Sequence, residues 1–236
     1  MARITRKNDD LLNEYKLYKK KFALCIIALF ITLFSSSILG PIAFIGFIIC
    51  GILFSKIGNK MLILKSGVEG EELTAEIISS LPDSFYAFQN VKVTYEDKTS
   101  ELDMVVVGPT GVFVIETKNM TGTILANYDN EQWVQKKKGE NGRTTSKTFY
   151  SPVKQVGTHV YRLAHYLRDN GCSVHVDSVV FFANPDANVQ LLGTPTQTLV
   201  LSMNVLGGSV LYTCLAEKEQ VLSDEIINQI CELLDK

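Results

Sequence analysis

The sequence predicts an α/β domain with a mixed central sheet flanked by helices, preceded by an N-terminal transmembrane helical hairpin. Two observations predict the domain: two apolar runs are joined by a Gly-Pro-Thr-Gly turn, and helical and strand-like segments alternate along the chain. A third observation predicts the hairpin, because residues 22–55 include no charged side chain. The 236 residues suffice for one medium-sized domain with an appendage.

The composition excludes some classes of protein. A net charge of −2 argues against a general polyanion-coating protein, whose binding rests on a large basic excess, although a local basic groove stays open. The five cysteines follow no disulfide or metal-binding spacing, so we expect reduced thiols, which are typical of a cytoplasmic domain. The three histidines include no HExxH motif and give little support for a zinc site.

The apolar stretch of residues 22–55 is too long for one span. A single helix of that length would reach about 50 Å, beyond the roughly 30 Å hydrocarbon core of a bilayer. Gly40-Pro41 divides the stretch, because proline removes a backbone donor and disfavours helix in the residue before it. We expect spans over residues 22–38 and 41–55. Each is near the lower length limit, so a re-entrant hairpin in one leaflet is the alternative.

Basic residues flank the two spans. Residues 1–21 form a polar, basic N-terminal segment, and residues 56–66 read as a basic linker to a main domain over residues 67–236. The positive-inside rule then places both termini and the main domain in the cytoplasm. We therefore expect a multi-pass protein of the plasma membrane of a prokaryotic cell, with the lipid bilayer as a partner through residues 22–55. A buried pair of soluble helices is the disfavoured alternative.

The main domain begins with a helix over Gly67–Leu81, which ends at Pro82. A strand over Phe85–Tyr95 follows, with a turn over residues 96–100. Ser151-Pro152 then opens a helix that runs to about Asn170. Further strands are expected over residues 104–107, 112–115, 123–127, 132–135, 174–183 and 198–203, and further helices over residues 205–215 and 223–235. The charged residues 136–143 read as a solvated hairpin tip in preference to a phosphate contact.

Two helices carry polar residues that require an explanation. Glu71 lies within the apolar arc of its helix, between Ala75 and Ile78, where an acid is costly unless paired or bound to a cation. The alternative is a helix N-terminal acid favoured by the macrodipole. On the later helix, Gln155 begins a polar line at i, i+4 and i+7 that includes His159 and Arg162. This line is either a solvated face or a substrate contact.

The central stretch of residues 101–119 carries the functional hypothesis. Asp103 starts its first apolar run, whereas Glu116 and Lys118 close the second and share one face of a strand. Asp103 and Glu116 suit Mg²⁺ (or Mn²⁺), with the carbonyl of Thr117 as an additional ligand and Glu71 as an outer-shell or second-metal contact. Lys118 would lie beside the attacking water and scissile phosphate. The alternative is a strand-end salt bridge from Lys118 to Glu116 or Asp103.

The segments GVEGE, ELDMVVVGPTGVFVIETKN and SPVKQ, with the tryptophan between the last two, resemble the nuclease-related domain (NERD) family. This family belongs to the restriction-endonuclease-like superfamily, whose signature is Asp…(Asp/Glu)-x-Lys, and the resemblance covers roughly residues 65–170. It implies a restriction-endonuclease-like fold with Asp103, Glu116 and Lys118 as the nuclease core. It also implies Glu71 as the helix acid and Gln155 as a polar residue that faces the site.

One position departs from the family pattern: Ser151 stands where an asparagine before the proline is common, and both residues can cap a helix. The leading expectation is a membrane-anchored, Mg²⁺-dependent nuclease that hydrolyses phosphodiester bonds of nucleic acid in the cytoplasm, with DNA as the expected substrate. The alternatives are a non-catalytic module that binds nucleic acid or nucleotides, and a membrane-associated scaffold. No helix-turn-helix, zinc-finger or stacking-aromatic motif supplies base readout, and no protein partner is indicated.

Overall fold

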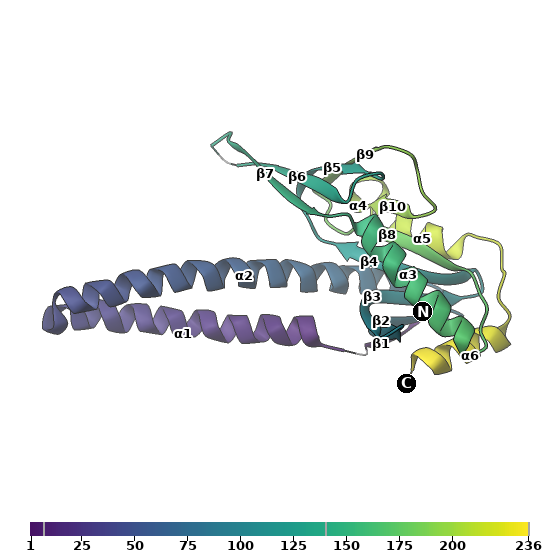
Figure 1. Cartoon of the computed structure of the whole chain (residues 1–236), viewed down its shortest axis with the longest axis horizontal. Coiled ribbons are helices and arrows are strands. Elements are labelled where there is room, and N and C mark those ends of the chain that lie inside the picture. Colours follow the sequence, from purple (N-terminus) through teal and green to yellow (C-terminus); the bar gives the residue numbers. More distant parts are fainter. Residues whose placement is uncertain (7, 140, 236) are drawn as a thin grey trace. The chain divides into compact units, whose positions relative to one another are not determined.

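The computed structural model describes residues 1–6, 8–139 and 141–235, and the chain divides into two compact units (Figure 1). One unit, Asp9–Glu69, is helical. The second unit combines Met1–Asn8 with Gly70–Lys236 and contains both sheets.

The helical unit is built from α1 (Asp10–Leu39) and the first part of α2 (Pro41–Ser79), with Gly40 between the two helices. The two helices run antiparallel (Figure 1). The rings of Phe22 and Phe54 stack between them, with centroids 4.6 Å apart. Both helices extend beyond the apolar residues. Residues 56–66, which the sequence suggested as a linker, are helical: they contain no proline, and their lysines, leucines and methionine are good helix formers that outweigh Gly58 and Asn59.

The exposed large apolar side chains of the helical unit are concentrated between Leu24 and Leu53. Among the described residues, one helical segment, Ala43–Ser79, is long and apolar enough to cross a membrane, and only 6% of its most apolar window is buried. Core helices of soluble proteins also meet that test of length and composition, but they are mostly buried. Helix α1 does not meet it over the residues described, so the arrangement with two spans remains a prediction.

The second unit contains a six-stranded sheet with the order β1-β2-β3-β4-β8-β10. The three central strands β2, β3 and β4 pair antiparallel, whereas β1, β8 and β10 each pair parallel with a neighbour. The predicted mixed sheet is therefore confirmed. Its strands are β1 (Arg3–Arg6), β2 (Tyr86–Tyr95), β3 (Lys98–Gly108), β4 (Gly111–Lys118), β8 (Val176–Phe182) and β10 (Leu199–Ser202).

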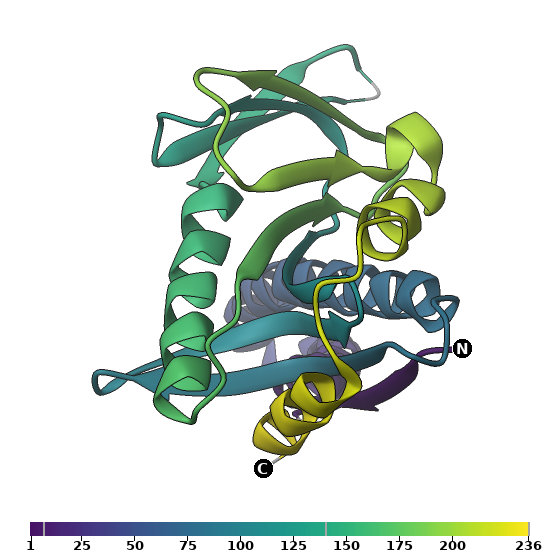
Figure 2. The same ribbon diagram turned by 90° about the vertical axis from the view of Figure 1, so that its right-hand side faces the viewer.

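A second, four-stranded sheet has the order β7-β6-β5-β9, so the expectation of a single central sheet was incomplete (Figure 2). Strands β5 (Gly122–Asn127) and β6 (Gln132–Lys138) were predicted, but not as a separate sheet. Strands β7 (Thr144–Tyr150) and β9 (Ala187–Leu192) were missed. Strand β7 is almost wholly exposed and shows no alternation of apolar and polar residues, whereas residues 187–191 of β9 do alternate and were a usable signal.

Helices cover both faces of the six-stranded sheet. Helices α3 (Pro152–Asp169) and α6 (Asp224–Leu234) pack on one face, together with the core side of the second sheet. The last turns of α2 and helix α5 (Ser209–Ala216) pack on the other, and the short α4 (Met203–Leu206) precedes α5. Because both faces are covered, the two central apolar runs are buried throughout, as their uniform composition predicted.

Candidate functional site

The register of the central strands places three polar residues in one row. The last regular pair between β3 and β4 is Met104↔Ile115, so Asp103 and Glu116 occupy the next opposing positions. The β2–β3 ladder likewise skips from Gln89↔Met104 to Val91↔Leu102, which places Asn90 opposite Asp103. Strand β4 continues to pair with β8 beyond this point. The polar row therefore lies where β3 leaves one edge of β4 open.

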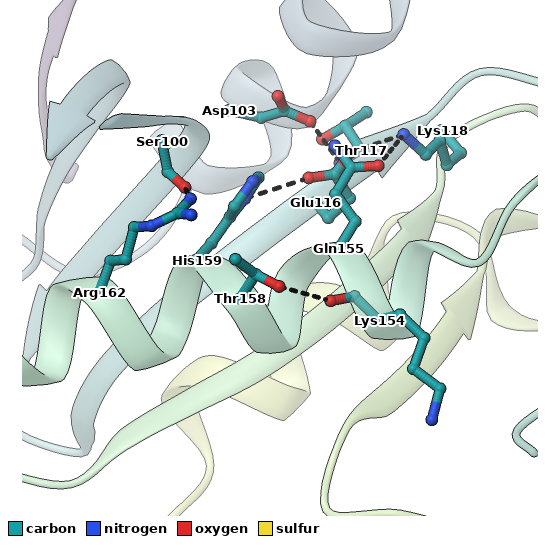
Figure 3. A network of polar contacts seen from close by, with 10 residues as sticks. All are labelled: Ser100, Asp103, Glu116, Thr117, Lys118, Lys154, Gln155, Thr158, His159 and Arg162. Atoms are coloured by element: carbon teal, nitrogen blue, oxygen red, sulfur yellow. Dashed lines mark hydrogen bonds and ion pairs between the residues drawn. The ribbon is translucent and has the colours of Figure 1, made fainter. Parts of the chain in front are cut away.

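Asp103 is fixed by the strand that it faces. Its Oδ2 accepts a hydrogen bond from the backbone N–H of Thr117 at 2.9 Å, a donor that the β3–β4 ladder no longer uses (Figure 3). Burial raises the pKa of Asp103, and the positive charge of Lys118 partly offsets that effect. The expected role of the Thr117 carbonyl as a ligand remains a prediction.

Glu116 and Lys118 point to the same face, as their spacing predicted. The side chain of Glu116 is 1% exposed, and its Oε1 accepts a hydrogen bond from Lys118 Nζ at 2.6 Å. Lys118 Nζ also donates to Oε1 of Gln155 at 3.2 Å (Figure 3). Burial, followed by the negative charge of Asp103, raises the pKa of Glu116 to about 8. Lys118 is therefore held between a buried carboxyl group and the amide of Gln155.

Helix α3 supplies Gln155 because its start is fixed locally. Ser151 caps the helix by accepting from the backbone N–H of Lys154 at 3.4 Å, and Pro152 occupies its first turn. Gln155 and His159 then lie one turn apart on the face that packs against the sheet (Figure 3). The interpretation of this polar line as a solvated face is therefore wrong for His159, which is 8% exposed.

His159 lies close to Oε2 of Glu116, the oxygen that does not bond Lys118. Its Nδ1 lies 3.5 Å from Oε2 of Glu116, at the limit of hydrogen-bond length (Figure 3). Over the described part of the chain, neither of these two buried atoms makes a hydrogen bond. Burial, with the positive charges of Arg162 and Lys118, lowers the pKa of His159 to about 4, so its imidazole is neutral at pH 7.

Glu71 lies on the other side of the polar row, on α2. Its Oε2 accepts a 3.4 Å hydrogen bond from Nδ2 of Asn90, which also donates to the carbonyl of Asn8 at 2.8 Å. Burial, followed by the charge of Asp103, raises the pKa of Glu71 to about 7. Close by, the hydroxyl groups of Thr74 and Thr117 lie 3.2 Å apart and link α2 to β4.

The donor set suits a hard cation. Among the described residues, no group of three or more His, Cys, Asp or Glu side chains is close enough to hold a metal ion. Asp103 and Glu116 nevertheless provide two opposing carboxyl groups, and Mg²⁺ is usually held by one or two carboxylates with water and phosphate. The unbonded Oε2 of Glu116 also fits such a ligand. The role of Glu71 at this site remains a prediction.

A simple salt bridge leaves part of this arrangement unexplained. The pair formed by Lys118 and Glu116 exists, but it uses only one oxygen of Glu116. A buried carboxyl oxygen without a partner is costly, and a second carboxyl group directly opposite increases that cost. Such unfavourable groups cluster at functional sites.

Sequence reasoning did not assign His159 or Asn90 to the site. The i+4 spacing of His159 from Gln155 was a usable signal, since it places both side chains on one helical face. In the sequence, Asn90 was marked only by its place beside Gln89, where two adjacent polar residues interrupt the alternation of the strand. The structure shows a local irregularity there, because Asn90 has a φ of 55°. Its contact with Glu71 depends on non-local packing and had no sequence signal.

The raised carboxyl pKa values predict how the stability of the metal-free protein depends on pH. In the folded protein the pKa is raised from 4.5 to about 7 for Glu71 and to about 8 for Glu116. Each group therefore stabilises the fold fully below pH 4.5, and this contribution is lost as the pH rises through its pKa in the folded protein. The lowered pKa of His159 acts in the opposite direction, but only below its ordinary value of 6.5. The midpoint of thermal unfolding should therefore fall between about pH 6.5 and 8.5.

Differential scanning fluorimetry with a chelator measures this midpoint. Glu116→Gln, which cannot ionise, should flatten the decline. An equally steep decline in Glu116→Gln and in the unmodified protein would show that Glu116 does not titrate in this window.

A sequence model described as "Nuclease-related domain" matches residues 66–183, half of the 236-residue chain. An uncharacterized protein of Bacillus anthracis is 41% identical over 71 residues, which cover 29% of this chain and 34% of that protein. The matched segment thus spans about a third of the length of that relative. No solved structure matches the chain.

Proposed function

Because this chain belongs to the nuclease-related domain family, a group of restriction-endonuclease-like proteins, we propose that it is a metal-dependent nuclease. The proposed reaction is hydrolysis of phosphodiester bonds of nucleic acid, with DNA as the expected substrate. The observation that carries the proposal is the buried Glu116 opposite Asp103, with Lys118 on the same strand face.

In this proposal the two carboxylates, Asp103 and Glu116, hold Mg²⁺ (or Mn²⁺). When bound, the ion would lower the pKa of a coordinated water and neutralise negative charge on the phosphate. The ammonium group of Lys118 is held by Glu116 and Gln155, so it can orient that water and offset charge on the scissile phosphate. Gln155 is then a positioning residue that acts through Lys118, and Glu71 contributes an outer-shell contact.

We further propose that residues 22–55 anchor the protein in a membrane as two short spans or a re-entrant hairpin. The exposed apolar side chains between Leu24 and Leu53 support this proposal, because a water-soluble surface rarely carries so many together. The basic segments on either side, residues 1–21 and 56–66, favour the cytoplasm for both termini and for the nuclease-related domain.

One experiment tests both parts of this proposal. Membranes are isolated from cells that express the full chain, washed at alkaline pH, and incubated with labelled DNA and RNA. The washed membranes should retain the protein and cleave DNA when Mg²⁺ is present, and a chelator should abolish cleavage. Binding without cleavage would support the non-catalytic alternative. Release of an active protein by the wash would contradict the anchor and leave the nuclease proposal intact.

A further inference from the structure

Strands β6 and β7 form a two-stranded ribbon, here called the basic ribbon, that extends from the second sheet (Figure 1). It carries an unusual concentration of positive charge in a chain whose net charge is −2. Within the described part of the chain, none of its basic side chains forms an ion pair, and all of them are exposed. These residues are Lys136, Lys137, Lys138 and Lys147 on the strands and Arg143 in the connection between them.

The charges of the basic ribbon lie on both of its faces. Lys136 pairs across the ribbon with Ser146, Lys137 with Thr145 and Lys138 with Thr144, so the lysines face hydroxyl groups rather than acids. Alternation places Lys136 and Lys138 on one face and Lys137 on the other. Such a surface of ammonium and hydroxyl donors suits a polyanion, because Lys, Ser and Thr are among the side chains that contact nucleic-acid phosphates.

The base of the basic ribbon is attached to both elements that carry the candidate site. On one side, Gln135 Nε2 donates to the carbonyl of Thr121 at 2.8 Å, three residues after Lys118. The adjacent Gly122 permits a close approach of β5 and β6, since a Cβ there would lie 2.4 Å from the carbonyl oxygen of Lys136. The position of the ribbon is therefore tied to the end of β4.

On the other side, strand β7 leads directly into α3. The backbone N–H of Ser151 donates to the carbonyl of Glu131 at 2.8 Å, which closes the base of the ribbon at the cap of α3. Gln155 follows within the first turns of that helix. The ribbon is therefore anchored at the start of the helix that carries Gln155.

From this arrangement we propose that the basic ribbon binds backbone phosphates of a nucleic-acid duplex. These phosphates lie away from the phosphodiester bond that would be cleaved at Asp103 and Glu116. The inference rests on the proposed nuclease function. Strand β6 pairs with β5 as far as Lys136, and its lysines, Lys136 to Lys138, span about 7 Å at roughly 3.4 Å per residue. Because a duplex rises about 3.4 Å per base pair, this length corresponds to about two base pairs. Lysine-to-phosphate contacts carry no sequence information, so the ribbon strengthens binding without selecting sequence.

The test compares two double variants of the full-length protein in detergent without divalent metal. One is Lys136→Gln/Lys138→Gln on the basic ribbon. Its matched control is Lys92→Gln/Lys98→Gln on the exposed β2–β3 hairpin, which removes the same charge. Binding to a labelled 30-base-pair duplex is measured at several salt concentrations. The ribbon variant should lose about 2 units of the slope of log K against log salt and bind at least about tenfold more weakly, whereas the control should match the unmodified protein.

The outcomes separate this inference from the nuclease proposal. Equal slopes for the ribbon variant and the unmodified protein would overturn the role of the ribbon, while cleavage by the unmodified protein would leave the nuclease proposal standing. If the unmodified protein neither bound nor cleaved nucleic acid, both proposals would fail. Thermal midpoints and circular dichroism should show that both variants fold.

A membrane surface is the competing partner for the basic ribbon. The full-length protein is therefore placed in nanodiscs of neutral or anionic lipids and treated with an acetylating reagent, with and without duplex. The extent of acetylation of each ribbon lysine is then measured. Protection of Lys136, Lys137 and Lys138 by the duplex in neutral nanodiscs supports the proposal. Protection by anionic lipid alone would overturn it and assign the ribbon to the membrane.

Discussion

Replacement of Lys118 by methionine is expected to lower the rate of DNA cleavage about 10²- to 10³-fold, the effect of removing a positioned group that stabilises transition-state charge. Methionine keeps the apolar stem and removes only the ammonium group that lies between Glu116 and Gln155. The rate of cleavage under saturating Mg²⁺ measures the effect. Binding of DNA should change much less, because it rests mainly on other basic groups.

Lys154→Met is the matched control, since Lys154 is exposed on α3 immediately before Gln155. It removes the same charge close to the site and should leave cleavage within a few-fold of the unmodified rate. If the bond from Lys118 to Glu116 were only structural, Lys118→Met would lower the thermal midpoint and cleavage would fall only in proportion to the unfolded fraction. Comparable activity in Lys118→Met and Lys154→Met would refute the proposed role.

The centre of the site could be predicted from the sequence because a short turn sets its register. Pairing of Gly108 with Gly111 across the turn places Met104 opposite Ile115 and, one step further, Asp103 opposite Glu116. Strand alternation then brings Lys118 to the face of Glu116. These relations are local, so they require no knowledge of the rest of the fold. The start of α3, and with it Gln155, also followed from the local Ser151-Pro152 signal.

The remaining features depend on contacts between distant segments. Strand β1 pairs in parallel with β2, about eighty residues later, and nothing in the segment Arg3–Arg6 marks it as a strand. Strand β7 is exposed along almost its whole length, so its sequence carries no burial pattern. The contact of Glu71 with Asn90 likewise arises only after α2 packs on the sheet. Sequence patterns reveal burial and local geometry. Strand β1, strand β7 and the contact of Glu71 with Asn90 are marked by neither.

Replacement of His159 is expected to weaken the binding of Mg²⁺, because His159 lies beside Oε2 of Glu116, whereas Lys118 bonds Oε1. With Glu116 ionised as a metal ligand, the neutral imidazole of His159, in its Nδ1–H tautomer, would donate a hydrogen bond to Oε2, since the two atoms already lie 3.5 Å apart. Partners of this kind fix the direction of a metal ligand, and their loss typically costs 10- to 100-fold in metal affinity or activity. His159→Gln should therefore lower the apparent affinity for Mg²⁺ by about that factor.

His159→Asn should retain most of that affinity, because the amide nitrogen of asparagine occupies nearly the position of Nδ1, whereas that of glutamine reaches the position of Nε2. Titration of the cleavage rate and of the thermal midpoint with Mg²⁺ measures the difference, and Thr158→Ala on the exposed side of α3 serves as the control. A role in packing alone would affect the two His159 variants according to side-chain volume. The order Asn above Gln in Mg²⁺ affinity, at similar metal-free stability, therefore distinguishes a directed hydrogen bond to Glu116 from the filling of space beneath it.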